Sequence, residues 1–416
     1  MNDVELYQAV LGIESPWKVA RVKLALDEGQ VDVHVEHGRG ERFACPQCAA
    51  MCPVYDHAPE RTWRHLDTCQ YRTLLHAEPP RVKCSEHGVR QVRLPWAERK
   101  SQFTLLFEAF AIDVLRATDV SRAAGILRIS WDEAWTIQKR AVKRGEARRA
   151  KQNRAIKQMG VDEKSPGRGK AMFTIVSDLE RKTVEWIGDG HKGATLDEYW
   201  ESLTKAELAA IEVVAMDMGQ AYFNSTLRQV PGAVKKIVFD RFHVMQAATR
   251  AVDQVRRNEH ASILRRGAKS PLSKTRYLWL YSEENLPERH LARFADLKDS
   301  EMKTAKAWGM KELLRNLWSF EYKPAAGRFL SSFIRSAKAM QLAPLRKLAG
   351  TLTDKCKNIL TYIDHCVTSA TCEGLNSAIQ AIKTRGRGYR NRGNFKTAIY
   401  FALGGLDLYP TLPATP

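Results

Sequence analysis

The chain has 416 residues, enough for several domains, and its 66 Lys and Arg against 47 Asp and Glu give a formal net charge of +19. This excess indicates a polyanionic partner, most commonly nucleic acid. The sequence shows no apolar run long enough to span a bilayer and no signal-peptide pattern at its start, so we expect a cytoplasmic protein without a membrane partner. Five of the eight Cys residues lie between Cys45 and Cys84, which favours a metal site over a disulfide framework.

The first predicted elements are two strands of a hairpin. Apolar and polar residues alternate over 19–24 and again over 31–35, with a polar turn between the two runs. Further strand-like stretches cover 62–66 and 71–77. We therefore expect a β-rich N-terminal domain.

Two metal-binding pairs lie in this β-rich region. Cys45 and Cys48 are separated by two residues, and so are Cys84 and His87. Four such ligands form a closed tetrahedral site, which is typical of a structural Zn²⁺ ion. Cys52 and Cys69 are alternative ligands that the spacing leaves open.

A helical region follows over 103–142, with Leu106, Phe110, Val114 and Leu115 predicted on one apolar stripe. Within it, residues 120–135 have the order helix, short turn, helix, and Ser130 with Glu133 matches a capping box. A helix-turn-helix would present the start of its second helix to the DNA major groove. The exposed candidates for contact are Trp131, Asp132, Thr136, Lys139 and Arg140. A plain helical hairpin is the alternative.

A strongly basic run continues the second helix. Residues 138–157 contain nine Lys or Arg and one acid, Glu146. Next to a helix-turn-helix, such a run indicates a linker that follows the phosphate backbone, although a solvated helix face has the same composition.

The following elements predict a mixed sheet. A strand ends in Asp162, a hairpin covers 171–177 and 183–187, and a helix near 195–203 precedes a strand that ends in Asp217. A helix around 223–229 and a fifth strand over 236–240 complete the series. This is the order of an RNase H-like sheet, in which the first and fourth strands lie side by side, so Asp162 and Asp217 should meet.

Three acids are candidates for catalysis: Asp162, Asp217 and Glu373, the last in a helical pattern. Carboxylates on separate elements can hold two Mg²⁺ or Mn²⁺ ions, which activate a nucleophile and stabilise the leaving oxygen in phosphodiester chemistry. Each acid taken alone also fits an ordinary strand end or helix cap. Asp240, which also ends a strand, is the alternative to Asp217.

The segment 241–355 is rich in helix formers and predicts a helical insertion. Its Trp279, Trp308 and Trp318 are expected mainly in the core. After it, Glu373, Asn376, Gln380 and Lys383 share one helix face. A Gly-broken basic loop then follows, in which charge would hold the DNA backbone and an aromatic ring would stack on a base, although a mobile solvated loop fits too. The nucleic-acid-binding candidates here are Lys383, Arg385, Arg387, Tyr389 and Arg390.

Several of these motifs together resemble one family. They are Gly160-Val161-Asp162-Glu163, Met216-Asp217-Met218 with Tyr222, Asp240-Arg241-Phe242-His243-Val244, Glu373-Gly374-Leu375-Asn376 and the tail 383–391. In this order they resemble the ISL-three family of bacterial insertion-sequence transposases over nearly the whole chain. The resemblance implies that Asp162, Asp217 and Glu373 form a DDE triad and that the protein acts as a dimer on paired DNA ends. Gln380 departs from the Lys that the family often has there, which favours Lys383 as the phosphate contact.

The sequence thus predicts a multidomain α/β transposase that binds terminal inverted repeats and cuts and joins DNA. The predicted parts are a β-rich zinc ribbon (1–98), a helix-turn-helix domain with its basic linker (99–152), the first part of an RNase H-like core (153–240), an all-helical insertion (241–355) and the last part of the core with a basic C-terminal loop and helix (356–416). One alternative is a DNA-binding repressor with an inactive core, and a weaker one is a nuclease that cuts without joining.

Overall fold

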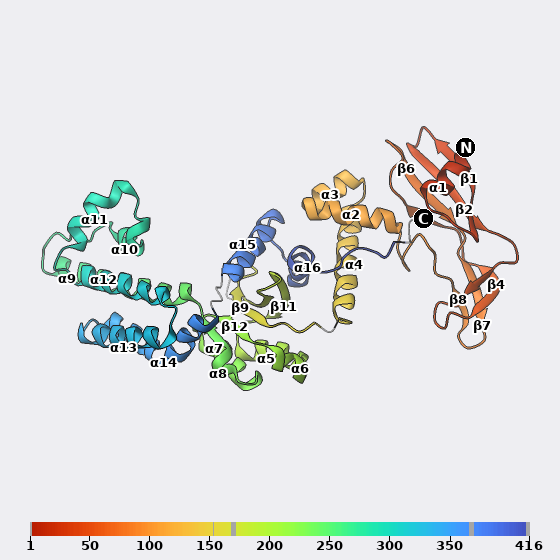
Figure 1. The fold of residues 1–416 in the computed structure, drawn as a ribbon. Helices are drawn as coiled ribbons and strands as arrows, with labels where there is room; N and C mark the ends of the chain where they lie inside the picture. Colours follow the sequence, from red (N-terminus) through yellow and green to blue (C-terminus); the bar gives the residue numbers. More distant parts are fainter. Residues whose placement is uncertain (1, 153, 168–171, 366–369, 413–416) are drawn as a thin grey trace. The chain divides into compact units, whose positions relative to one another are not determined.

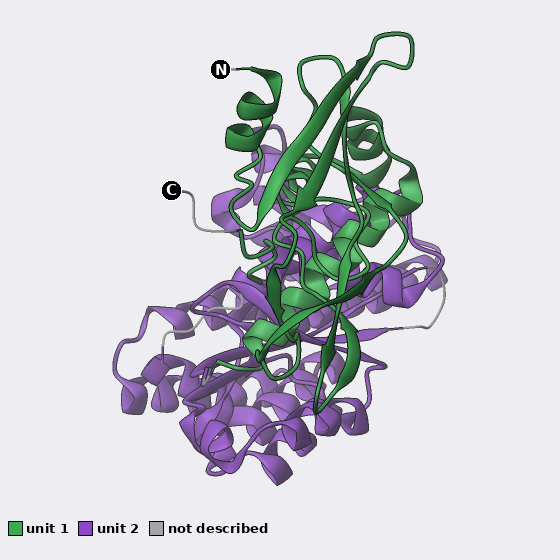
Figure 2. Ribbon diagram, turned by 90° about the vertical axis from the view of Figure 1, so that its right-hand side faces the viewer, with its two compact units in different colours: residues 1–152, 406–416 green, residues 153–405 purple. Residues whose placement is uncertain are grey.

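The computed structural model describes residues 2–152, 154–167, 172–365 and 370–412. The chain forms two compact units, residues 1–152 with 406–416 and residues 153–405 (Figure 2). Residues 406–416 therefore belong to the first unit, whereas the sequence grouped them with 356–405. Each unit is described separately below.

The first unit begins with two four-stranded sheets, of order β1-β2-β6-β5 and β3-β4-β7-β8. The predicted hairpin is confirmed as β1 and β2, and the strand-like stretches as β5 and β6. The elements are α1 (Asp3–Val10), β1 (Trp17–Ala25), β2 (Gln30–His37), β3 (Arg42–Ala44), β4 (Met51–His57), β5 (Arg61–Arg64), β6 (Arg72–Ala77), β7 (Pro80–Cys84) and β8 (Gly88–Gln91).

Alternation of side chains gives the first sheet one apolar face and one polar face. Val31, Val33 and Val35 of β2 and Leu75 of β6 are buried in a core that also contains Trp63, whereas the residues between them point to the other side. The core therefore lies against one face of this sheet only.

Three helices complete the first unit: α2 (Leu105–Ala117), α3 (Val120–Leu127) and α4 (Trp131–Arg149). The predicted order of helix, turn and helix is confirmed in α3 and α4. Ser130 caps α4, since its hydroxyl accepts from the Glu133 amide at 3.2 Å and the Glu133 carboxylate accepts from the Ser130 amide at 2.8 Å. Arg128 makes the tight turn between the helices with a left-handed φ of 54°.

The predicted apolar stripe of α2 is wrong in part, because Phe110 is 47% exposed while Glu108 is buried. The Glu108 carboxylate accepts from Arg140 at 2.6 Å and from Arg144 at 2.8 Å. Arg140 is therefore half-buried and paired, so its predicted exposure is only partial and its DNA contact stays a prediction. A charged side chain is accepted on the buried face because two guanidinium groups reach it.

The second unit is built on a five-stranded sheet of order β11-β10-β9-β12-β13. β9 pairs antiparallel with β10 and parallel with β12, which in turn is parallel to β13. The predicted adjacency of the first and fourth strands is confirmed. The strands are β9 (Gln158–Lys164), β10 (Phe173–Asp178), β11 (Thr183–Asp189), β12 (Val213–Met216) and β13 (Ile237–Phe239).

Helices cover both faces of this sheet (Figure 1). On one face lie α5 (Gly193–Ser202), α6 (Lys205–Ala210), α7 (Gln220–Gln229) and α8 (Ala233–Lys236), and on the other α15 (Ala370–Arg385) and α16 (Arg392–Leu403). Met159, Val161, Met216 and Phe239 pack toward the first group. Phe173 and Ile175 of β10 pack against α15 and α16.

The segment 241–365, between β13 and the residues before α15 that the structure does not describe, is mostly helical. Trp279 and Trp308 are buried in its core, whereas Trp318 is half-buried and meets Tyr362 edge-on at 5.1 Å. The predicted boundary after Lys355 falls inside a single helix, α14, because that helix runs without a break from Ala343 to His365. The helices are α9 (Arg241–Arg265), α10 (Arg276–Leu280), α11 (Leu291–Lys298), α12 (Lys303–Arg315), α13 (Lys323–Ala339) and α14 (Ala343–His365), with short 3-10 turns at Glu283–Asn285, Glu288–His290 and Asn316–Ser319.

Within the part of the chain that the structure describes, no helix has both the length and the apolar character needed to cross a bilayer.

The pairing of Glu108 with Arg140 and Arg144 should contribute to the stability of α4. Replacing Glu108→Gln leaves two guanidinium groups facing a neutral amide, so we expect the opening free energy of α4 to fall by about 3 kcal/mol. The matched control is Glu98→Gln, which removes the other, more exposed partner of Arg144 and should cost less than about 1 kcal/mol. Hydrogen–deuterium exchange of α4 measures both, and equal effects of the two changes would contradict the account.

Candidate functional site

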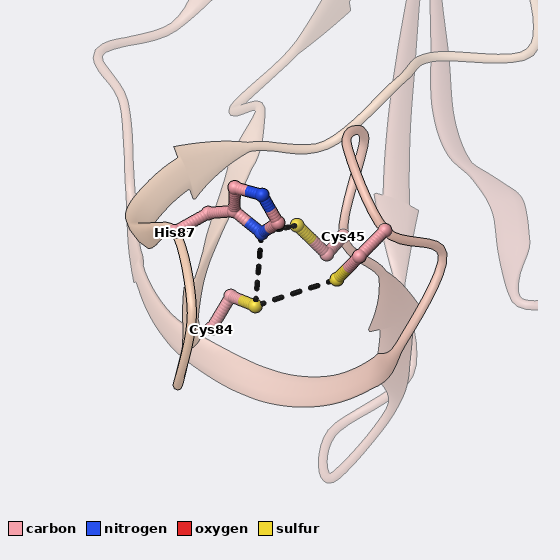
Figure 3. A group of neighbouring side chains, drawn as sticks. Cys45, Cys84 and His87 are labelled. Atoms are coloured by element: carbon pink, nitrogen blue, oxygen red, sulfur yellow. Dashed lines mark hydrogen bonds between the residues drawn. The ribbon is translucent and has the colours of Figure 1, made fainter.

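The four predicted zinc ligands lie together at one end of the second β-sheet. Cys45 and Cys48 follow β3, Cys84 ends β7, and His87 lies in the turn to β8. The Cys48 and Cys84 sulfurs are 3.6 Å apart, and His87 Nδ1 lies 3.6 Å from Cys84 Sγ and 3.9 Å from Cys45 Sγ (Figure 3). Tetrahedral Zn²⁺ would place two thiolates about 3.8 Å apart and a thiolate and an imidazole about 3.6 Å apart. The residues therefore fit a structural zinc ion.

The backbone favours the thiolate forms of Cys45 and Cys84, whereas the pKa of Cys48 is raised, because the Ala50 amide, which lowers it, is outweighed by burial and the sulfurs of Cys84 and Cys45. Amide groups of Cys48 and Gln47 donate toward the Cys45 sulfur and lower its pKa. Amides of Glu86 and His87 do the same for Cys84 and lower its pKa to about 7. Deprotonated sulfur is the form that binds metal, so the turns prepare these two ligands before the ion arrives.

The two alternative ligands lie outside this group of four. The Cys52 thiol donates to the Ala50 carbonyl at 3.4 Å, and burial raises its pKa. Cys69 is exposed. The paired two-residue spacing was therefore the better guide to the ligand set.

The exposed face of α4 carries part of the predicted DNA-contact set. Trp131 is 45% exposed, and Thr136 and Lys139 are also exposed, while Trp135 behind them is buried. Asp132, Thr136 and Lys139 recur at four- and three-residue spacing, so they share one side of the helix. Arg140 lies off this face, because it is turned inward to Glu108.

Much of the basic run over 138–157, which begins within α4, is paired with acids. Arg144 bonds Glu98 and Glu108, Arg148 bonds Asp407, Arg154 bonds Glu185 and Lys157 bonds Glu212. The prediction that the whole run follows phosphates is thus too broad. Lys139, Lys143 and Lys151 remain exposed.

Three aspartates lie at one level of the five-stranded sheet of the second unit: Asp162 within β9, Asp217 directly after β12 and Asp240 directly after β13. Met216 is in register with Val161 on one side and with Phe239 on the other. The next residues along these parallel strands are Asp162, Asp217 and Asp240. Since Val161, Met216 and Phe239 pack toward α5–α8, alternation directs the aspartates to the opposite face, which α15 covers.

Helix α15 approaches β9 closely because residue 160 is glycine. A Cβ built on Gly160 would lie 2.2 Å from the Cys372 sulfur, which no real side chain could tolerate. Cys372 is buried with Ala215 and Leu179, and Glu373 is the next residue, on the exposed side of the helix. The helix is therefore seated beside the strand that carries Asp162.

Asp162 is held by two N–H donors. Its Oδ1 accepts from the Glu163 amide at 2.7 Å and its Oδ2 from Asn376 Nδ2, on α15, at 2.5 Å. The Asn376 carbonyl in turn accepts from Lys164 Nζ at 2.9 Å. Asp217 Oδ1 accepts from the Gly219 amide at 2.8 Å.

Burial and neighbouring negative charge raise the pKa values of Asp162 and Glu163. Burial raises the pKa of Asp162, and the nearby Asp217 charge adds to the rise, against the Glu163 amide, His243 and Asn376. The pKa of Glu163 is raised by burial and then by Asp217. Ionised carboxylates in this position would be stabilised by an added cation, so the donor set fits hard divalent metal ions.

The carboxylates are not gathered into one tight group. Among the described residues, only Cys45, Cys48, Cys84 and His87, and separately His34, Glu60 and His76, bring three or more such ligand atoms within 4.8 Å of one another. Asp162, Asp217 and Glu373 therefore lie around the same edge without converging. Asp240 is 3% exposed and raises the pKa of Cys372, together with Asp162 and Glu373 and after the larger effect of burial.

The C-terminal end of α15 carries the remaining basic candidates. Arg385, Arg387 and Arg390 are exposed, and Lys383 is half-buried near Lys164, whose pKa is lowered by burial and then by Lys383. Tyr389 differs from its prediction. Its ring stacks on Phe395 at 4.9 Å and packs over Gly386, so it is occupied within the fold and not free for a base.

Two features were not predicted from the sequence. They are the hydrogen bond from Asn376 to Asp162 and the close packing of Cys372 against Gly160. Asn376 was placed on the face of Glu373 by helical spacing alone. Gly160, two residues before Asp162, could have indicated the close packing, because a glycine inside a strand often marks close approach of another backbone or side chain.

The ligand geometry predicts that zinc is part of the fold of the ribbon. Replacing Cys84→Ser should remove the zinc equivalent of the ribbon and expose the amides of β3, β4, β7 and β8, because metal binding and folding are coupled in small zinc sites. Cys69→Ser, at an exposed thiol outside the group, should keep both zinc and protection. Metal analysis with hydrogen exchange gives the result, and a Cys84→Ser protein that binds as much zinc as wild type and keeps the protection of these strands would refute the ligand assignment.

Models of known protein families match three successive regions of the chain. A sequence model described as a transposase, the DDE domain of the ISL3 (ISL-three) family, matches residues 159–399. A zinc-finger model of the transposases of IS204, IS1001, IS1096 and IS1165 matches residues 41–87. The helix-turn-helix domain of transposase family ISL3 matches residues 92–142.

Two curated relatives are similar over nearly their whole length. The transposase for insertion sequence element IS1001 of Bordetella parapertussis is 27% identical over 97% of this chain and 99% of its own. The transposase for insertion sequence element IS1557 of Mycobacterium tuberculosis is 26% identical over 99% of this chain and 98% of its own. Because the DDE-domain match alone covers more than half of the chain, the chain belongs to the ISL3 family of insertion-sequence transposases.

Proposed function

We propose that this transposase cuts and joins DNA at the terminal inverted repeats of its element by two-metal catalysis in an RNase H-like core, with Asp162, Asp217 and Glu373 as the metal ligands. The observation that carries the proposal is the row of aspartates at one level of parallel strands, with α15 seated beside it on Gly160. The strand order β11-β10-β9-β12-β13 supports the RNase H-like description.

Two bound Mg²⁺ or Mn²⁺ ions would activate the attacking oxygen and stabilise the leaving one. Asp162 is oriented for this role by the Glu163 amide and Asn376, which leave its oxygens little freedom. Asp217 and the exposed Glu373 would complete the ligand set, and rotation of the Glu373 side chain would bring it to the ions. Water, and then a freed 3′-hydroxyl, is the nucleophile, so no covalent protein–DNA intermediate forms.

Asp217 is preferred over Asp240 as the second ligand. Its charge acts on both Asp162 and Glu163, whereas Asp240 lies one strand farther from Asp162. Asp240 also directly precedes α9, and it is almost fully buried.

The DNA-binding surface that we propose has two parts. The exposed face of α4, with Trp131, Thr136 and Lys139, would enter the major groove at the element's end. On the second unit, Lys383, Arg385, Arg387 and Arg390 would hold the phosphate backbone near the carboxylates. A dimer on two paired ends would allow both ends to be joined in one assembly.

The cleavage assay uses purified protein, a labelled duplex of the element end, and Mg²⁺ or Mn²⁺. Wild type is expected to nick at the element boundary, and Asp162→Ala, Asp217→Ala and Glu373→Ala to lose at least about a thousandfold in rate while still binding the duplex, because removing a metal ligand abolishes the chemistry and not the docking. Strand-transfer products then separate a transposase from a nuclease.

Asp240→Asn is the matched comparison, since it changes an aspartate at the same level of the sheet and keeps its shape. Cleavage lost in this variant and retained in Asp217→Ala would move the second ligand to Asp240. If wild type binds the ends tightly and cuts with neither metal, a DNA-binding repressor with an inactive core replaces the proposal.

A further inference from the structure

A second group of metal-type ligands lies on the polar face of the first β-sheet, away from the cysteines. His34 belongs to β2, His76 to β6, and Glu60 directly precedes β5. The Glu60 carboxylate lies 3.8 Å from His34 Nδ1 and 3.7 Å from His76 Nδ1. We propose that His34, His76 and Glu60 bind one divalent transition-metal ion of the Zn²⁺, Co²⁺ or Ni²⁺ class, in addition to the zinc of the ribbon.

The strand pairing places the two histidines together. β2 and β6 are parallel with His34 in register with His76, so both rings leave the sheet on the same face at the same level. Their centroids are 4.7 Å apart with an interplanar angle of 18°. The opposite face of the same strands is filled by Val33, Val35 and Leu75, so the site stands on a packed core.

A buried carboxylate orients His76. Asp32, which is 8% exposed, accepts from His76 Nε2 at 2.8 Å. A carboxylate can only accept, so Nε2 carries the proton and the lone pair of Nδ1 points toward Glu60. The Thr62 hydroxyl donates to this Nδ1 at 3.3 Å, and the Glu60 carboxylate is a second oxygen near the same lone pair at 3.7 Å. A cation bound between Nδ1 and Glu60 would replace the Thr62 hydrogen bond and relieve the repulsion between the two acceptors. A carboxylate behind a ligand histidine is the usual support of a metal site.

His34 is held in the other tautomer by Arg21. Arg21 Nη2 lies 3.1 Å from His34 Nε2, and because a guanidinium only donates, that nitrogen accepts and Nδ1 carries the proton. Burial lowers the pKa of His34, followed by the effects of His76 and Arg21, so the ring is neutral near pH 7. Metal binding moves the proton from Nδ1 to Nε2 and displaces the exposed Arg21, which therefore competes with the ion.

The ligand chemistry selects the metal. Two imidazoles and a carboxylate suit borderline divalent ions and are poor ligands for Mg²⁺, which prefers oxygen alone. Three protein ligands leave at least one position for water or another donor, in contrast to the closed Cys₃His group.

The test is a Co²⁺ titration of the metal-free full chain in excess Mg²⁺, which occupies oxygen-only sites. Wild type is expected to take two equivalents, the first with strong thiolate charge-transfer absorption from the ribbon and the second without it. His76→Gln should lose the second equivalent and keep the first, which also shows that the ribbon is folded. His57→Gln, at a surface histidine outside the group, should keep both.

Two further variants test the surroundings of the ligands. Asp32→Asn should weaken the second equivalent about 10- to 100-fold, as expected for loss of a carboxylate that supports a ligand histidine. Arg21→Ala should tighten it, because the competing donor is gone. A wild-type chain that takes one equivalent only, or a second equivalent that survives the double change His34→Gln with His76→Gln, would overturn the proposal and leave an ordinary ion-pair cluster.

Discussion

The arrangement of carboxylates at the proposed catalytic edge depends on the close approach of α15 to β9 at Gly160. This contact is a steric condition that only glycine meets, because a Cβ would fall 2.2 Å from the Cys372 sulfur and 2.8 Å from Ser177 Oγ and a Leu179 methyl carbon. It holds Asn376 on Asp162 and keeps Glu373 at the same face of the sheet, although more than two hundred residues separate the two elements. The long helical segment between them can therefore vary without moving the carboxylates, provided this one contact is kept.

Charge in this protein serves two purposes that composition alone does not distinguish. Part of the positive excess is used inside the fold, as in the two guanidinium groups that share Glu108 and in the pairs of Arg154 and Lys157. Other basic side chains are exposed, among them Lys139 on α4 and Arg387 and Arg390 after α15. Basic groups paired inside the fold cannot contribute to a DNA-binding surface, so the net charge overstates the charge that can face nucleic acid.

Local patterns in the sequence predicted most of what local physics decides. The capping box at Ser130, the two-residue spacing of the cysteine pairs and the strand order of the second sheet all follow from short stretches of chain, and the structure agrees with them. Predictions that needed a distant partner were less successful. Arg140 and Tyr389 were placed at the surface because Glu108 and Phe395, which hold them in the fold, cannot be identified as their partners from sequence alone.

The same limit applies to the site itself. Asp217 and Asp240 follow strand ends as predicted, whereas β9 continues past Asp162 to Lys164. Their shared level on three parallel strands required the register, and the support from Asn376 required the packing of α15. The pair His34 and His76 likewise becomes a candidate metal site only when β2 and β6 are seen in register.

The most direct test of metal catalysis at this edge is a change of metal preference at one ligand. Asp217→Cys replaces a hard oxygen by a sulfur that binds Mg²⁺ poorly and Mn²⁺ better. The account predicts that this variant binds the element end, fails to cut it with Mg²⁺, and recovers cleavage at the same boundary with Mn²⁺, whereas Asp217→Ala recovers with neither ion. Equal cleavage by Asp217→Cys with both ions, or rescue of Asp217→Ala by Mn²⁺, would show that Asp217 does not hold the metal.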